Sequence, residues 1–134
     1  MQYTYAFEKM AVWQLGRQVV KQIYLQTKSF PKEETFGVTS QIRRAGTSVC
    51  CNLAEGSARV GPVDQNRFYE IAFGSAVEVV NLLIICNDLE YISNTGYALL
   101  RTDMERLTYS INNLSGKKPP GTLREPDALY DTPL

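Results

Sequence analysis

Residues 97–114 of the 134-residue chain read YALLRTDMERLTYSINNL, and their pattern indicates the fold more clearly than any other segment. Its apolar residues recur at spacings of 3, 4, 3, 4 and 3, and they are Tyr97, Leu100, Met104, Leu107, Ile111 and Leu114. This heptad pattern is typical of an α-helix that buries one stripe against neighbouring helices. We therefore expect a helix over residues 95–114 whose apolar seam faces a bundle core.

Glycine and proline are clustered in this chain, and the clusters separate three further long segments upstream. Clustered turn residues favour long helices over the short, evenly spaced strands of an all-β domain. We expect helices over residues 7–28, 39–56 and 64–91. Short connections between four long helices predict an all-α, antiparallel up-down-up-down four-helix bundle over residues 1–115. Residues 116–134 are rich in proline and are interpreted as a C-terminal tail.

Particular residues suggest where these helices end. Pro31 ends the first helix, because the residue before a proline avoids the α conformation. Thr39 or Ser40 is expected to cap the second helix, and Gly56 to terminate it. Asp64 is the expected cap of the third. The stripes expected to face the core are Val12, Leu15, Val19 and Ile23, then Ile42, Ala45, Val49 and Leu53, and in the third helix Phe68, Ile71, Ala72, Ser75, Val79, Leu82, Cys86 and Leu89.

Two features of the middle helices concern packing. Gly46 lies in mid-helix, where glycine costs on the order of 1 kcal/mol against alanine, so we expect a close approach of another helix there. The third helix is the most apolar segment, and Val80, Leu83, Ile84 and Ile85 lie off its stripe. A single chain of 15.1 kDa has too few helices to cover such a surface, so a contact between subunits is expected.

The composition excludes several kinds of chemistry. Histidine is absent, which removes Ser-His-Asp and Cys-His nucleophile sites, zincin motifs and the Glu-x-x-His di-iron pattern. No catalytic, cofactor-binding or metal site is expected, and the protein is expected not to be an enzyme. The three cysteines, an odd number without C-x-x-C spacing, favour a reduced cytoplasmic protein. We expect neither a signal peptide nor a membrane span, because the richest apolar run, residues 79–86, is short and contains Asn81.

The zero net charge hides an uneven distribution. Residues 1–67 carry nine Lys and Arg against five Asp and Glu, so the second half carries the opposite excess. One interpretation is an anion-attracting face, and the other is helices that neutralise each other on packing. The overall neutrality, with a pI of about 6.3, weighs against phosphate binding by the basic residues.

Five basic residues are the candidate nucleic-acid-binding residues: Arg43, Arg44, Arg17, Lys21 and Arg59. Arginine forks bind phosphate bidentately and stay charged at any working pH. Adjacent helical residues point about 100° apart, so at most one of Arg43 and Arg44 lies deep. The structural alternative is that the deeper arginine pairs with Glu55, Glu70 or Glu78, while the other basic residues form an ordinary solvated face.

Three other groups of side chains have both a functional and a structural interpretation. The N-terminal aromatic residues, Tyr3, Tyr5 and Phe7, either stack on unpaired bases or pack against the bundle or a neighbouring subunit, and packing is favoured. The half-buried carboxylates are expected to be Glu55, Glu70 and Glu78, in salt bridges rather than on a metal. The cysteines, Cys50, Cys51 and Cys86, are interpreted as small core residues. Trp13, Tyr24 and Tyr109 fall on helical stripes and are interpreted as core or interface residues.

Four stretches carry a family resemblance: FPKEETFGV at 30–38, QIRRAGTSV at 41–49, NLAEG at 52–56 and FYEIAFGSA at 68–76. They resemble the four-helix-bundle proteins encoded by intervening sequences in bacterial 23S ribosomal RNA genes, which are related to the accessory variability determinants of diversity-generating retroelements. The resemblance implies an antiparallel four-helix subunit that assembles as a homopentamer. From the retroelement members it further implies nucleic-acid binding and association with a reverse transcriptase.

The functional expectation has two forms. The first is an oligomeric accessory or scaffold protein that binds RNA, DNA or a nucleic-acid-processing enzyme through surface arginines. The alternative is a protein–protein interaction scaffold without any nucleic-acid contact. The expected partners are further copies of the chain, with RNA, DNA or a reverse transcriptase as additional partners and no membrane.

Overall fold

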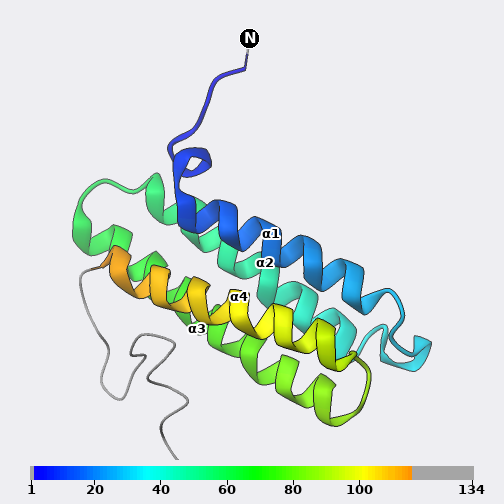
Figure 1. Ribbon diagram of the computed structural model, residues 1–134. Helices are drawn as coiled ribbons and strands as arrows, with labels where there is room; N and C mark the ends of the chain where they lie inside the picture. Colours follow the sequence, from blue (N-terminus) through cyan, green and yellow to red (C-terminus); the bar gives the residue numbers. More distant parts are fainter. Residues whose placement is uncertain (1, 116–134) are drawn as a thin grey trace, which may run out of the picture.

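The computed structural model describes residues 2–115, which form four α-helices and two short 3-10 helices (Figure 1). The α-helices are α1 (Ala11–Thr27), α2 (Val38–Ser57), α3 (Pro62–Asp88) and α4 (Asn94–Leu114), and the 3-10 helices are η1 (Ala6–Lys9) and η2 (Lys32–Glu34). The expected all-α four-helix bundle is therefore confirmed. The tail expected over residues 116–134 lies outside the described residues.

The four helices lie side by side with alternating direction. Figure 1 places the α1–α2 and α3–α4 connections at one end of the bundle, and the α2–α3 connection with the N-terminal segment at the other. Each helix packs against its neighbours in sequence, and α1 also packs against α4. This arrangement encloses one apolar core, whose largest fully buried side chains are Ile23, Ile42, Leu53, Leu83, Met104, Leu107 and Ile111.

The heptad seam of α4 lies in this core from Leu100 to Ile111, as its periodicity predicts, whereas Leu114 at its end is 37% exposed. Leu100, Met104, Leu107 and Ile111 are each at most 2% exposed. Ser93 is the N-cap of α4, since its hydroxyl accepts a hydrogen bond from the Gly96 N–H at 3.0 Å. Tight packing of α2 against α1 is confirmed as well: a Cβ atom at Gly46 would lie 2.9 Å from Ile23 Cδ1.

The predicted stripe of α3 is partly wrong. Ile71 and Leu89 are 47% and 49% exposed, whereas Tyr69, Ala76 and Leu83 are buried in their place. Because apolar residues occur on nearly every side of this helix, periodicity alone could not choose the buried side. The choice comes from the two helices that α3 packs against, α2 and α4.

The N-terminal boundary of the first helix also differs from the expectation. Residues 6–9 form η1, and Met10 is extended with φ −77° and ψ 121°, so that α1 begins at Ala11. The cause is local: the Glu8 carboxylate accepts a hydrogen bond from the Tyr5 N–H at 2.8 Å, which closes a separate capped turn.

The expected caps of α2 and α3 are wrong. Gly37, not Thr39 or Ser40, precedes α2, and Gly56 lies inside the helix. Gly61 precedes α3 with a φ of 89°, a left-handed conformation that favours glycine. Pro62 then occupies the first turn, where its missing N–H costs nothing, and this places Asp64 inside the helix.

The outward side of α3 keeps a row of exposed apolar side chains: Ile71, Val77, Ile84, Ile85 and Leu89, each at least 40% exposed. An 18-residue window of α3 has a mean hydropathy of 1.7, and 33% of that window is buried in the bundle. Length and composition would therefore allow this helix to cross a bilayer, so the premise that no apolar segment is long enough is wrong. In the structure α3 packs along α2 and α4.

Candidate nucleic-acid interface

Arg43 is the deeper of the two adjacent arginines, as the 100° offset predicts. Its Nε atom donates to the Thr27 hydroxyl at 2.9 Å, and its guanidinium carbon lies 4.6 Å from the centre of the Tyr24 ring. The expected carboxylate partner is not formed, because the α1 helix that faces Arg43 contains no Asp or Glu. A hydroxyl and an aromatic ring hold the guanidinium in place while leaving its charge uncompensated.

Arg44 points away from α1 and lines an open groove between α2 and α3. The groove has a volume of about 720 Å³, and Cys51 and Glu78 line it together with Arg44. Within residues 2–115, Arg44 forms no ion pair shorter than 4 Å, and it is exposed. Its guanidinium is therefore available to a ligand.

Arg17 and Lys21 lie on α1 on the same side as Tyr24. The 3.6-residue repeat aligns Trp13, Arg17, Lys21 and Tyr24 along the helix, and the Arg17 guanidinium carbon is 5.5 Å from the centre of the Trp13 ring. Both basic side chains are exposed. Arg43 covers Tyr24 from α2, and Lys21 and Arg17 precede Tyr24 by three and seven residues on the same side of α1. The three basic side chains therefore follow one line along α1, and we call them the basic cluster.

Arg59 lies elsewhere, at the turn between α2 and α3. Sixteen residues separate it from Arg43, which corresponds to roughly 24 Å along a helix. It is also paired: its Nη2 atom lies 2.8 Å from Glu55 Oε1, and its Nε atom lies 4.0 Å from Asp64 Oδ2. The structure therefore does not bring Arg59 together with Arg43.

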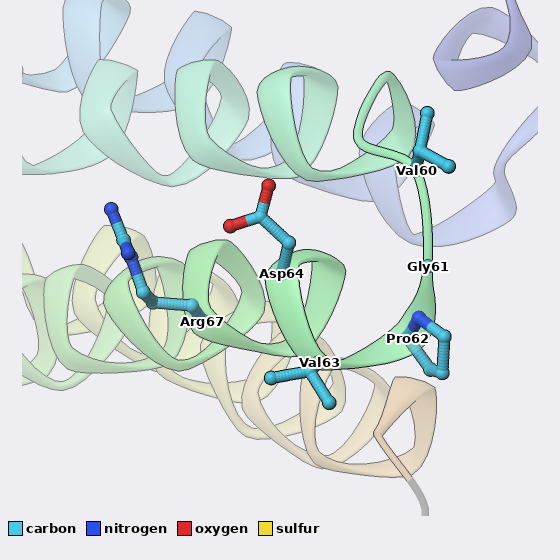
Figure 2. A pocket seen from close by; sticks show the side chains of 6 residues that line it. All are labelled: Val60, Gly61, Pro62, Val63, Asp64 and Arg67. Carbon is cyan, nitrogen blue, oxygen red and sulfur yellow. The ribbon is translucent and has the colours of Figure 1, made fainter.

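The turn beside Arg59 is apolar at its tip. Val60 and Val63 are 95% and 85% exposed, and they line a shallow hollow of about 290 Å³ with Gly61, Pro62, Asp64 and Arg67. Figure 2 shows Asp64 and Arg67 extending from α3 toward the neighbouring helix, with Val60 and Pro62 at the bend. Arg59 also lies 4.6 Å above the Phe68 ring, so its ion pairs and this ring keep it in a local cluster.

The charge asymmetry of the sequence separates by helix. Helices α1 and α2 together contain four basic residues and one acidic residue, whereas α3 contains one basic and four acidic residues. Arg59 pairs with Glu55 and Asp64, but none of Arg17, Lys21, Arg43 and Arg44 forms an ion pair within residues 2–115. The α1–α2 side of the bundle therefore carries an uncompensated positive charge.

The carboxylates expected to be half-buried are exposed: Glu55, Glu70 and Glu78 all face solvent, and Glu55 pairs with Arg59. The buried carboxylate is Glu105 of α4, 7% exposed, which Arg101 contacts at 3.3 Å. The i, i+4 spacing of Arg101 and Glu105 is the sequence pattern that could have identified this pair. No group of three or more Cys, Asp or Glu side chains within residues 2–115 is placed to hold a metal ion.

The three cysteines occupy different environments. Cys86 is buried and Cys50 is half-buried, in agreement with a core role, but Cys51 is exposed. Burial, with a smaller contribution from Cys51, raises the pKa of Cys50 to about 11. Burial, with a smaller contribution from Glu34, also raises the pKa of Cys86 to about 11. Raised pKa values keep both thiols protonated and therefore unreactive at neutral pH.

Fold and site together define a four-helix bundle with a positively charged α1–α2 side. The family model of the 23S rRNA-intervening sequence protein matches residues 8–113, and the chain belongs to this family. It is also similar to the crystal structure of a protein with unknown function from the S23 ribosomal protein family of Bacteroides thetaiotaomicron VPI-5482. That similarity has a TM-score of 0.72 at 21% identity and covers 80% of this chain and 100% of the other, so it supports the fold alone. No curated protein matches the chain.

Proposed function

We propose that the protein is a non-enzymatic, homo-oligomeric accessory protein that binds nucleic acid through basic side chains of α1 and α2. The observation that carries this proposal is the basic cluster, Arg17, Lys21 and Arg43, together with the exposed Arg44. None of these four side chains forms an ion pair among residues 2–115. Unpaired Arg and Lys side chains on two neighbouring helices favour binding to a phosphate backbone, which needs no sequence-specific pocket.

Arg43 suits this role although it is half-buried. Its Nε–H is used by Thr27 and its face lies over Tyr24, which orders the guanidinium at little further entropic cost to a bound phosphate. RNA and DNA both offer the required phosphates. A nucleic-acid-processing enzyme such as a reverse transcriptase, which the similarity to retroelement accessory proteins implies, is a further partner of the same complex.

The homo-oligomer is proposed on the outward side of α3. Five large apolar side chains there are at least 40% exposed, and they occur along one helix rather than scattered over the surface. Exposed apolar side chains grouped along one helix mark contacts between proteins, and a symmetric homo-oligomer buries them on every copy. The resemblance to the accessory determinants makes a pentamer the expected assembly.

The same α3 side favours the second candidate function, a protein–protein interaction scaffold without nucleic-acid contact. In that case a different protein covers Ile71, Val77 and Ile84, and the basic cluster is a solvated face. The two candidates differ in one measurable property, which is affinity for nucleic acid at low salt.

The decisive experiment is fluorescence anisotropy of labelled structured RNA and single-stranded DNA over a salt series. If four basic side chains bind phosphates, log affinity for the single strand falls with log salt concentration with a slope of about −3. The triple variant Arg17→Ala, Lys21→Ala, Arg44→Ala should reduce the slope to about −1. Arg106→Ala, which removes an exposed charge on α4, is the matched control and should leave the slope unchanged. Absence of binding at low salt would contradict the proposal and favour the second candidate function, a protein–protein interaction scaffold.

A further inference from the structure

Four aromatic rings form a continuous series at the N-terminal end of the bundle, and we call Tyr3, Tyr5, Phe7 and Trp13 the aromatic ladder. Tyr3 contacts Tyr5 edge-on with ring centres 5.1 Å apart, and Tyr5 stacks on Phe7 at 6.1 Å with an interplanar angle of 19°. Phe7 meets Trp13 edge-on at 4.9 Å. Tyr3 and Tyr5 remain 79% and 60% exposed, so the outer half of the ladder presents rings to solvent.

Hydrogen bonds hold the segment that carries these rings. The Tyr5 N–H donates to Glu8 Oε2 at 2.8 Å, and the Glu8 N–H donates back to the Tyr5 carbonyl at 3.1 Å. Gln14 of α1 donates from Nε2 to the Glu8 carbonyl at 2.8 Å. Because the backbone at Tyr5 and Glu8 is tied to α1, the Tyr5 ring is held before any ligand arrives, which lowers the entropic cost of binding; Tyr3 is held by its ring contact with Tyr5. The only carboxylate in this segment, Glu8, is engaged as the cap.

The aromatic ladder is continuous with the basic cluster. Arg17 lies over Trp13 at 5.5 Å, Lys21 is one turn further along α1, and Arg43 lies over Tyr24 at 4.6 Å. Trp13 and Tyr24 are eleven residues apart, which is roughly 17 Å of helix. Helix α1 contains no Asp or Glu, so within residues 2–27 the single carboxylate beside the rings and the positive charges of α1 is Glu8, which accepts the Tyr5 N–H.

We propose that this surface binds a single-stranded segment of nucleic acid, with bases stacked on Tyr3 and Tyr5 and phosphates along Arg17 and Lys21. This inference rests on the proposed function and specifies the form of nucleic acid bound. Aromatic rings beside a basic groove bind single strands irrespective of sequence, because every base has a face that can stack. A duplex keeps its bases stacked internally and offers only its phosphates to Arg17 and Lys21. The positive charge of the surface favours a polyanion over an apolar protein segment as the occupant.

The test compares oligo-dT and oligo-U of about 15 nucleotides with a DNA duplex of the same length, in anisotropy titrations at low salt. The Tyr3→Ala/Tyr5→Ala variant should bind both single strands at least about thirtyfold more weakly, while its duplex affinity and its salt slope stay unchanged. Tyr3→Phe/Tyr5→Phe keeps both rings and should restore single-strand binding. Phe36→Ala is the matched control, because Phe36 is an aromatic side chain that is 96% exposed at the opposite end of the bundle. Trp13 is the single tryptophan of the chain, so quenching of its fluorescence reports occupancy at the inner end of the ladder.

Each other outcome has a defined meaning. Equal affinity for single strands and duplex, or an Ala variant that binds like the wild type, overturns the inference while leaving nucleic-acid binding intact. A Tyr3→Ala/Tyr5→Ala variant whose molar mass falls in light scattering overturns it too, because the rings then pack between copies. If the wild type binds none of the three probes, the proposed function itself fails.

Discussion

Gly56 of α2 lies against the ring of Tyr69 of α3 so closely that a Cβ atom at position 56 would be 2.7 Å from Tyr69 Cε1. Two atoms at that distance would overlap, so the two helices can approach here only because residue 56 has no side chain. Glycine at this position therefore serves packing, and the helix continues through it to Ser57.

The Gly56→Ala variant should accordingly lose about 1–3 kcal/mol of unfolding free energy, because Tyr69 is buried and has little room to move. Gly74, in the middle of α3, provides the matched control, since a Cβ atom there meets nothing within 4 Å. Gly74→Ala should raise the stability of the subunit by about 0.5–1 kcal/mol. Urea denaturation measures both, and equal effects of the two substitutions would contradict the packing argument.

Glu90 ends α3 in a left-handed conformation, with a φ of 61°. Two hydrogen bonds form a Schellman motif at this helix end: the Tyr91 N–H donates to the Cys86 carbonyl at 3.0 Å, and the Glu90 N–H donates to the Asn87 carbonyl at 3.0 Å. A residue with a Cβ atom pays about 1 kcal/mol in this conformation. Glu90→Gly should raise the thermal midpoint, whereas Glu90→Ala, which removes the same charge and keeps the Cβ atom, should not. A lower midpoint for Glu90→Gly would count against this account.

The three thiols should react in a fixed order. Cys51 is exposed in the α2–α3 groove, while burial raises the pKa values of Cys50 and Cys86 to about 11. In a titration with a disulfide reagent at pH 8, one thiol per chain should react rapidly and two slowly. Cys51→Ser should abolish the rapid phase. A rapid phase that persists in this variant would show that Cys50 or Cys86 opens to solvent.

The same raised pKa values predict how stability depends on alkaline pH. In the unfolded chain a thiol loses its proton near pH 9, but in the native protein Cys50 and Cys86 keep theirs up to about pH 11. Between these values the unfolded state binds fewer protons than the native state, so the free energy of unfolding should fall as pH rises. Below pH 9 the thiols should contribute no pH dependence. Cys50→Ala should show a shallower fall than the wild type, and identical curves would contradict the assignment.

Assembly through α3 predicts a molar mass in solution that is larger than that of one chain. Light scattering should give a multiple of the 15.1 kDa chain mass, with five copies expected. Val77→Glu and Ile84→Glu place a charge among the exposed apolar side chains of α3 and should dissociate the oligomer, because a buried unpaired charge is costly. Leu99→Glu is the control, since Leu99 is 64% exposed on α4 and lies outside that row. A wild type that remains a monomer at micromolar concentration would contradict the proposed assembly.

The candidate site could be predicted only in part. The 100° offset of adjacent helical residues correctly made one of Arg43 and Arg44 the deeper one, but which of the two, and its partner, depended on α1. A hydroxyl from Thr27 and a ring from Tyr24 occupy the place where a carboxylate was expected. Arg59 was grouped with the other candidates because of its charge, although the length of α2 places it at the far end of the bundle.

Four helices, the seam of α4 and the need for a small residue at Gly46 follow from periodicity and spacing along one chain, because local interactions are enough to set them. The buried side of α3 depends on packing between helices, since α2 and α4 cover Tyr69 and Leu83 and leave Ile71 and Leu89 exposed. The position of Arg43 over Tyr24 of α1 depends on the same packing. Burial and pairing across helices depend on residues distant in sequence, and a periodic pattern within one helix carries no information about them.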